Sequence, residues 1–209
     1  MNPTKYFNAM KKKFGSDART ELYYTNEFTL AIAVILSAQA TDKHVNTCTP
    51  ALFAAADTPE KFLTLGLQGL KDFIKSISFF NNKAKNIIAL SEKLLGRALP
   101  HERDELVKLP GIGRKTANVV SNILWGAPNI GVDTHVFRLS HRFGWAGAAD
   151  NTPEKVERRL VEIIPPRFHD LANHLMVMHG RYICKALRPK CDDCPVAKIC
   201  PCKNAAAVV

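Results

Sequence analysis

The stretch "LPGIGRKTANVV", residues 109–120, joins two helical patterns through a turn of proline and glycine. The upstream pattern, ERDELVKL (102–109), ends before Pro110 because a residue that precedes proline disfavours the α conformation. The downstream pattern, RKTANVVSNILWG (114–126), places four apolar side chains on one face: Val119, Val120, Ile123 and Leu124. The stretch therefore predicts a helix–hairpin–helix motif.

The hairpin and its basic flank predict a site for a phosphate group. Gly111 and Gly113 allow backbone conformations closed to other residues and let another backbone approach closely. The start of the second helix offers N–H groups to an anion. A nucleotide-binding P-loop is excluded, because Arg114 stands where that motif needs glycine and a helix precedes the turn. The alternative is a turn whose glycines serve packing alone. We expect DNA contacts from Leu109, Gly111, Ile112, Gly113 and Arg114.

Composition favours a globular protein with a polyanionic partner. The chain has 209 residues, 46% of them hydrophobic, and a formal net charge of +10. Such a charge favours nucleic acid as the partner, with solubility as the alternative explanation. The N-terminus lacks the apolar core of a signal peptide, and no apolar run reaches membrane-spanning length. We expect an intracellular, cytoplasmic protein that associates with DNA and not with a membrane.

Helical patterns recur through the rest of the chain, and strand signals are nearly absent, so we predict an all-α fold. Thr58 and Thr152, each followed by proline, are predicted N-caps, as is Asp133. The segment 83–96 is expected to pack through one apolar face: Ile87, Ile88, Leu90, Leu94 and Leu95. Further helices are predicted over 28–39, 58–65, 133–144 and 152–164.

Four of the six cysteines form a C-x6-C-x2-C-x5-C pattern: Cys184, Cys191, Cys194 and Cys200. Without a secretory signal, disulfides are not expected, and four close thiols indicate a metal site. Structural zinc sites usually draw on two close ligand pairs, whereas only one such pair occurs here, which favours an iron–sulfur cluster over zinc. Cys202 is interpreted as a non-ligand and Cys48 as a core residue. Lys185, Arg188 and Lys190 would make the first cysteine loop a phosphate-binding loop.

These motifs, together with LSAQATD (36–42) and VDTHVFRLSHRFG (132–144), resemble the endonuclease III family over about residues 22–200. The family consists of DNA glycosylases of the helix–hairpin–helix superfamily that also act as abasic-site lyases. The resemblance implies a six-helix domain over 20–130 that carries the hairpin. It also implies an iron–sulfur domain built from 1–19 and 131–209, with a DNA-binding cleft between the two domains. We expect a monomer that binds double-stranded DNA containing oxidised pyrimidines or abasic sites.

The resemblance also assigns roles to individual residues. Lys115 matches the nucleophile, Asp133 the catalytic carboxylate, and Cys184, Cys191, Cys194 and Cys200 the ligands of a [4Fe-4S] cluster. A primary amine can displace the base and form a Schiff base with the sugar, after which β-elimination cuts the strand. A helix N-terminus, with Arg114 and Lys108 nearby, should disfavour the lysine cation. Asp133 would stabilise positive charge on the sugar, and its alternative role is only an N-cap.

Gln39 matches the residue that fills the gap left by a flipped nucleotide. Ser78 and Phe79 depart from the family pattern of glycine followed by an aliphatic wedge residue. We assign Phe79 as an aromatic wedge; the alternative places Phe79 in the core and exposes Phe80.

Two other functions compete with this prediction. A monofunctional, adenine-removing glycosylase of the same superfamily would lack the lysine and carry a further C-terminal domain. A metal-braced DNA-binding or electron-transfer module would explain the hairpin and the cysteines, but not Lys115 together with Asp133.

Overall fold

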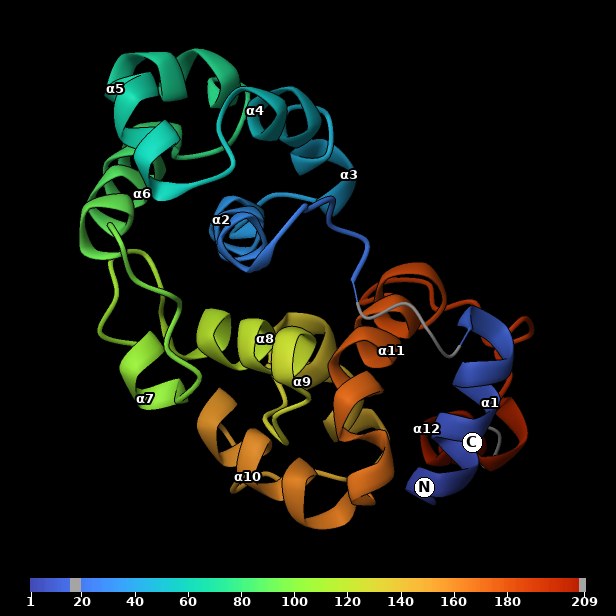
Figure 1. The fold of residues 1–209 in the computed structure, drawn as a ribbon. Helices are drawn as coiled ribbons and strands as arrows, with labels where there is room; N and C mark the ends of the chain where they lie inside the picture. The colour runs from blue at the N-terminus through green and yellow to red at the C-terminus, as the bar shows by residue number, and fades with distance from the viewer. Residues whose placement is uncertain (16–19, 207–209) are drawn as a thin grey trace. The chain divides into compact units, whose positions relative to one another are not determined.

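The computed structural model describes residues 1–15 and 20–206, and in these residues helices are the only regular secondary structure (Figure 1). The all-α prediction is therefore confirmed for the described part of the chain. Residues 16–19 and 207–209, which belong to the predicted segments 1–19 and 131–209, lie outside the described residues. No helix in the described ranges is long and apolar enough to cross a membrane.

The chain divides into two compact units. One unit is continuous and spans Glu21–Trp125, and the other combines Met1–Thr20 with Gly126–Val209. The continuous unit contains α2 (Glu27–Ser37), α3 (Asp42–Val45), α4 (Thr49–Ala55), α5 (Pro59–Ile74), α6 (Phe80–Lys93), α7 (Arg103–Leu106) and α8 (Arg114–Trp125). The other contains α1 (Pro3–Phe14), α9 (Thr134–Arg142), α10 (Pro153–Ile163), η1 (Pro166–Phe168), α11 (His169–Tyr182), η2 (Ala197–Ile199) and α12 (Pro201–Ala206).

Helix α2 forms the centre of the continuous unit. All nine residues from Phe28 to Leu36 are buried, as expected for a helix that is apolar on most sides. Helices α3, α6 and α8 contact it and lie around it in Figure 1. Cys48 is buried in the same core, which confirms its predicted place. The end of α2 and the start of α8 are thereby held by one apolar core.

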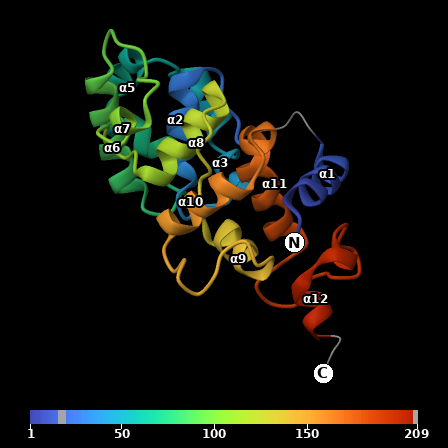
Figure 2. The same cartoon turned by 90° about the horizontal axis from the view of Figure 1, so that it is seen from below.

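Helix α1 completes the core of the discontinuous unit. It packs against α11, and Figure 2 shows the two helices side by side. Tyr6, Phe7 and Met10 are fully buried there, and the Tyr6 ring contacts the rings of Phe143 and Trp145. This core carries the segment that follows α11, which contains the four patterned cysteines.

Several helix boundaries differ from those predicted. The backbone of α5 is non-helical at Gly66 (φ 70°), so the predicted helix over 58–65 corresponds to its first part, and a second part that was not predicted continues to Ile74. Helix α7 is a single turn, shorter than the predicted 102–109. Leu95 is 51% exposed, so its predicted place on the apolar face of 83–96 is wrong. The cause is that α6 ends at Lys93, and the chain has left the helical register before Leu95.

Candidate active site and cysteine pocket

The chain between α7 and α8 forms a tight turn. The amide of Ile112 donates to the carbonyl of Leu109 at 3.2 Å, and Gly111 has φ 77°. Pro110 and Gly111 thus occupy the two central positions of a type II turn, where proline and glycine are favoured. The amide of Ala117 donates to the carbonyl of Gly113 at 2.9 Å and closes the first turn of α8. The hairpin predicted from the sequence is present.

The two glycines of the turn have different roles. A Cβ at Gly111 would lie 3.0 Å from Cβ of Asn86, and an L-residue there would have to adopt the left-handed backbone conformation. Gly113 has no positive φ, and a Cβ there would meet nothing within 4 Å. The backbone freedom predicted for both is therefore needed only at Gly111. The open space at Gly113 is consistent with its other predicted role, the close approach of a second backbone.

The turn presents cations at the start of α8. Arg114 and Lys115 are exposed, and the first turn of α8 contains no acidic residue. Lys108, expected to add to the repulsion there, instead pairs with Glu105 at 2.6 Å. Ile112 is only 3% exposed, so its side chain supports the turn from inside. The outer surface of the turn thus combines a glycine backbone with two basic side chains.

Asp133 is the N-cap of α9, as predicted. One of its carboxylate oxygens accepts from the amides of His135 and Val136, both at 2.8 Å. The helix that Asp133 caps is held to α11 by Arg138, whose guanidinium donates to the carbonyls of Gly180 and Cys184 at 2.9 and 3.1 Å. The capping role is therefore present, and it fixes the carboxylate at a rigid helix end.

Three non-glycine residues in the described ranges have a left-handed backbone: Gln39 (φ 57°), Phe79 (φ 58°) and Arg188 (φ 51°). All three were predicted from the sequence to contact DNA. Backbone conformations of this kind are uncommon for bulky residues and concentrate at functional sites. Phe79 is 63% exposed, whereas Phe80 is partly buried against the core. The alternative that buried Phe79 and exposed Phe80 is therefore wrong.

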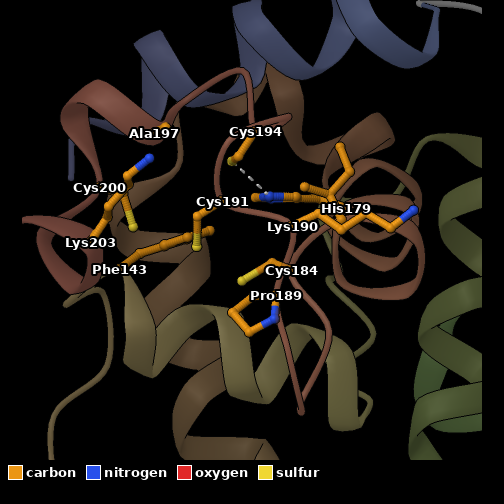
Figure 3. Close-up of a pocket in the computed structure, with 11 residues that line it drawn as sticks. Phe143, His179, Cys184, Pro189, Lys190, Cys191, Cys194, Ala197, Cys200 and Lys203 are labelled. Atoms are coloured by element: carbon orange, nitrogen blue, oxygen red, sulfur yellow. Dashed lines mark hydrogen bonds between the residues drawn. The ribbon is translucent and has the colours of Figure 1, made fainter. Parts of the chain in front are cut away.

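The four patterned cysteines line one pocket between α9, α11 and the C-terminal segment. Figure 3 shows their side chains arranged around it, together with Phe143, His179 and Pro189. Cys202 does not line it and is exposed. No group of three or more His, Cys, Asp or Glu side chains in the described ranges is placed to hold a single metal ion. The donor set is four sulfurs around a space bounded largely by apolar groups.

Two thiols of the pocket lie within hydrogen-bond distance of a side-chain nitrogen. The guanidinium of Arg142 donates to Sγ of Cys184 at 3.2 Å and to the carbonyl of Lys185 at 2.7 Å. Nε2 of His179 lies 3.4 Å from Sγ of Cys194, and its Nδ1 lies 3.1 Å from the Tyr6 hydroxyl. Burial, which is the larger cause, and Arg138 lower the pKa of His179 to about 4, so its ring is neutral at pH 7.

A neutral His179 has one donor nitrogen and one acceptor nitrogen. If Cys194 is a thiolate, Nε2–H donates to sulfur and Nδ1 accepts from the Tyr6 hydroxyl. Burial raises the pKa of the Cys184 and Cys194 thiols, so thiolates there need compensating positive charge. No role at the pocket was predicted for His179 or Arg142, although Arg142 lies in the motif VDTHVFRLSHRFG (132–144). Their relation to the pocket depends on how α9 and α11 pack.

The loop between Cys184 and Cys191 is a basic surface. Lys185, Arg188 and Lys190 are all exposed. Arg142 braces the loop through the carbonyls of Lys185 and Ala186, and the amide of Lys190 donates to the carbonyl of Ile183 at 2.9 Å. The loop is thus held at both ends beside the cysteine pocket.

The helical hairpin, with two cations at the start of its second helix, places the chain in the class of helix–hairpin–helix proteins. The model of the HhH-GPD superfamily of base excision DNA repair proteins matches residues 32–166, and the chain belongs to this family. It is 54% identical to the endonuclease III of Rickettsia conorii over 90% of each chain. It is 44% identical to that of Escherichia coli over 88% of each chain.

The fold of a solved relative agrees. A trapped covalent complex of endonuclease III with DNA matches with a TM-score of 0.88 and 42% identity, covering 98% of this chain and 96% of that one. The resemblance to the endonuclease III family is thereby confirmed. The chain is a base excision repair enzyme of the endonuclease III class, a DNA glycosylase with abasic-site lyase activity.

Proposed function

We propose that the chain removes oxidised pyrimidines from duplex DNA and then cleaves the abasic site, with Lys115 as the nucleophile. The observation that carries this proposal is the exposed amine of Lys115 in the first turn of α8, directly after the hairpin. The trapped covalent intermediate described for the 42%-identical relative supports a mechanism in which the protein supplies a nucleophile.

The reaction proceeds in two stages. The neutral amine of Lys115 forms a bond to C1′ of the sugar, the glycosidic bond breaks, and the base leaves with a proton. Opening of the sugar ring gives a protonated Schiff base. This imine accepts electrons from the C2′–H bond as that proton is removed, and the C3′–O bond breaks to release the 3′ phosphate. Hydrolysis of the imine regenerates Lys115.

We assign Asp133 as the carboxylate that stabilises positive charge on the sugar and assists proton transfer. Its bonds to the amides of His135 and Val136 fix its orientation. The hairpin residues Leu109, Gly111, Gly113 and Arg114 are proposed to bind a backbone phosphate. Gln39 and Phe79 are proposed to occupy the space left when the damaged nucleotide leaves the stack.

The cysteine pocket is proposed to hold a [4Fe-4S] cluster through Cys184, Cys191, Cys194 and Cys200. Four sulfurs around one pocket, two of them near nitrogen donors, fit such a group. When bound, the cluster supplies the positive charge that stabilises the buried thiolates. The chain's own contribution is to hold the basic loop, with Lys185, Arg188 and Lys190, in a fixed position for phosphate binding.

Borohydride trapping with abasic-site DNA tests the nucleophile. We expect the wild type to form a covalent adduct and Lys115→Ala to form none. Lys115→Arg is the matched control, because it keeps the positive charge and should bind DNA while forming no adduct. A folded wild type that excises the base without an adduct would favour a monofunctional glycosylase. A wild type that binds DNA but neither excises the base nor forms an adduct would favour a binding module.

Substituting Asp133→Asn tests the carboxylate. Asparagine caps helices as well as aspartate does, so the free energy of unfolding should change by less than about 0.5 kcal/mol. Single-turnover excision of thymine glycol should fall roughly 10²–10⁴-fold, the range for loss of a positioned acid–base group. Unchanged excision would show that Asp133 serves only as the N-cap of α9.

Cys191→Ser and Cys202→Ser form a matched pair for the cluster. We expect Cys202→Ser to contain about four iron atoms per chain and to be brown like the wild type. Cys191→Ser should lose most of its iron. A colourless wild type that contains zinc would contradict the cluster.

A further inference from the structure

Lys83 of α6 is a buried cation. Its residue is only 7% exposed, and its Nζ donates to the carbonyls of Leu36 and Ala38 at 2.8 and 2.6 Å. Among the described residues, no carboxylate lies within ion-pair distance of Lys83. Burial lowers the pKa of Lys83, so its environment is unfavourable to the charge unless the two carbonyls stabilise it. A lysine in such a place needs a structural explanation, because buried charges are otherwise rare.

The two carbonyls lie at the end of α2. The last carbonyls of a helix lack hydrogen-bond donors within the helix and carry partial negative charge. An ammonium group supplies both the donors and the positive charge that such carbonyls favour. Ala38 is the C-cap of α2, and Gln39 follows it with φ 57°. Lys83 therefore fixes the backbone immediately before the left-handed residue Gln39.

Lys83 also belongs to the turn that contains Phe79. Its own amide donates to the carbonyl of Phe79 at 3.1 Å and closes the first turn of α6. Phe79 is the left-handed N-cap of that helix and makes no side-chain cap bond. One residue thus holds the Phe79 turn through its backbone and the Gln39 turn through its side chain.

We infer that Lys83 is a positioning residue that locks the Gln39 and Phe79 turns together, so that both side chains meet the duplex as one preformed unit. The inference rests on the proposed function, in which these side chains replace the extruded nucleotide. The ammonium group of Lys83 donates to two backbone carbonyls, so Lys83 acts through the turns and not by contact with DNA. The step that it governs is extrusion of the nucleotide, not bond breaking at the sugar.

Lys83→Met tests the lock, because it keeps an unbranched side chain and removes the donors. Lys85→Met is the control, since Lys85 is exposed on the same helix and loses the same charge. Single-turnover excision of thymine glycol from duplex DNA should fall roughly ten- to hundredfold relative to the control, the range for a lost charged hydrogen bond. Cleavage of an abasic site in a single strand, which requires no extrusion, should stay within about threefold.

Two readouts separate positioning from a general loss of structure. Fluorescence of 2-aminopurine opposite the lesion should show reduced extrusion at saturating protein. Hydrogen exchange without DNA should accelerate at residues 38–40 and 79–80 together, with α8 unchanged. Equal loss of both activities, or acceleration at only one turn, would overturn the inference. A wild type that cannot excise thymine glycol would refute the proposed function instead, while the exchange measurement would still test the lock.

A second variant guards against failure of Lys83→Met to fold. Lys83→Gln keeps an amide donor for only one of the two carbonyls, so its excision should lie between that of Lys83→Met and that of Lys85→Met and remain at least severalfold below that of Lys85→Met. If Lys83→Gln excises within about twofold of Lys85→Met and leaves both turns protected, the lock does not exist.

Discussion

The hairpin turn at Leu109–Gly113 and the turns at Gln39 and Phe79 reach the same left-handed backbone by different means. In the hairpin, Gly111 adopts φ 77° at no steric cost. Gln39 and Phe79 adopt φ 57° and 58° as residues that disfavour it, and Lys83 bonds to the backbone beside both. The hairpin turn is encoded locally, whereas the backbone before Gln39 depends on the side chain of Lys83, 45 residues from Ala38 in the chain. The Phe79 turn is closed by the backbone amide of the same lysine. At these two turns the strained residue is one whose side chain is proposed to contact DNA.

Replacing Gly111 with alanine should have the largest effect on stability in this comparison. The left-handed conformation costs an L-residue about 1–2 kcal/mol, and Cβ of Asn86 would lie 3.0 Å from the new methyl group. We expect the free energy of unfolding to fall by about 2–3 kcal/mol in denaturant titration. Gly113→Ala, with no positive φ and open space, should change it by less than about 0.5 kcal/mol. Equal losses of stability in the two variants would show that the left-handed backbone and the contact with Asn86 do not make Gly111 the more sensitive position.

Phe79→Gly should stabilise the protein, in contrast to Gly111→Ala. Glycine removes the cost of the left-handed backbone, and an exposed ring contributes little to folding, so the free energy of unfolding should rise by up to about 1 kcal/mol. Excision from duplex DNA should fall, because the side chain proposed to act as the wedge is lost. A less stable Phe79→Gly variant would mean that the turn is not strained.

Gln39→Asn should give the smallest change. Asparagine tolerates the left-handed region better than glutamine, so stability should rise by about 0.5 kcal/mol. The shorter amide should reach the orphaned base less well and weaken discrimination among opposite bases in competitive excision assays. Unaltered discrimination would argue that Gln39 does not contact that base.

The sequence allowed prediction of those parts of the fold that are determined locally. Thr58, Thr152 and Asp133 cap their helices as predicted, because capping depends on a few neighbouring residues. Helix α11 was not predicted, since its buried face includes His169, His174 and His179, which do not produce an apolar pattern. The cysteine spacing indicated one pocket, but the nitrogen donors of His179 and Arg142 come from other helices and leave no local signal.

The contact between Tyr6 and His179 has a consequence for how the protein is made. Tyr6 leaves the ribosome 173 residues before His179. The apolar face of α1 therefore cannot be covered by α11 until almost the whole chain has been synthesised. The cysteine pocket borders the same histidine, and the last cysteine that lines it is Cys200. Docking of the first helix, and assembly of the cluster proposed for the pocket, would therefore be late events of biosynthesis. A ribosome that stalls before α11 would leave Phe7 and Met10 exposed to aggregation.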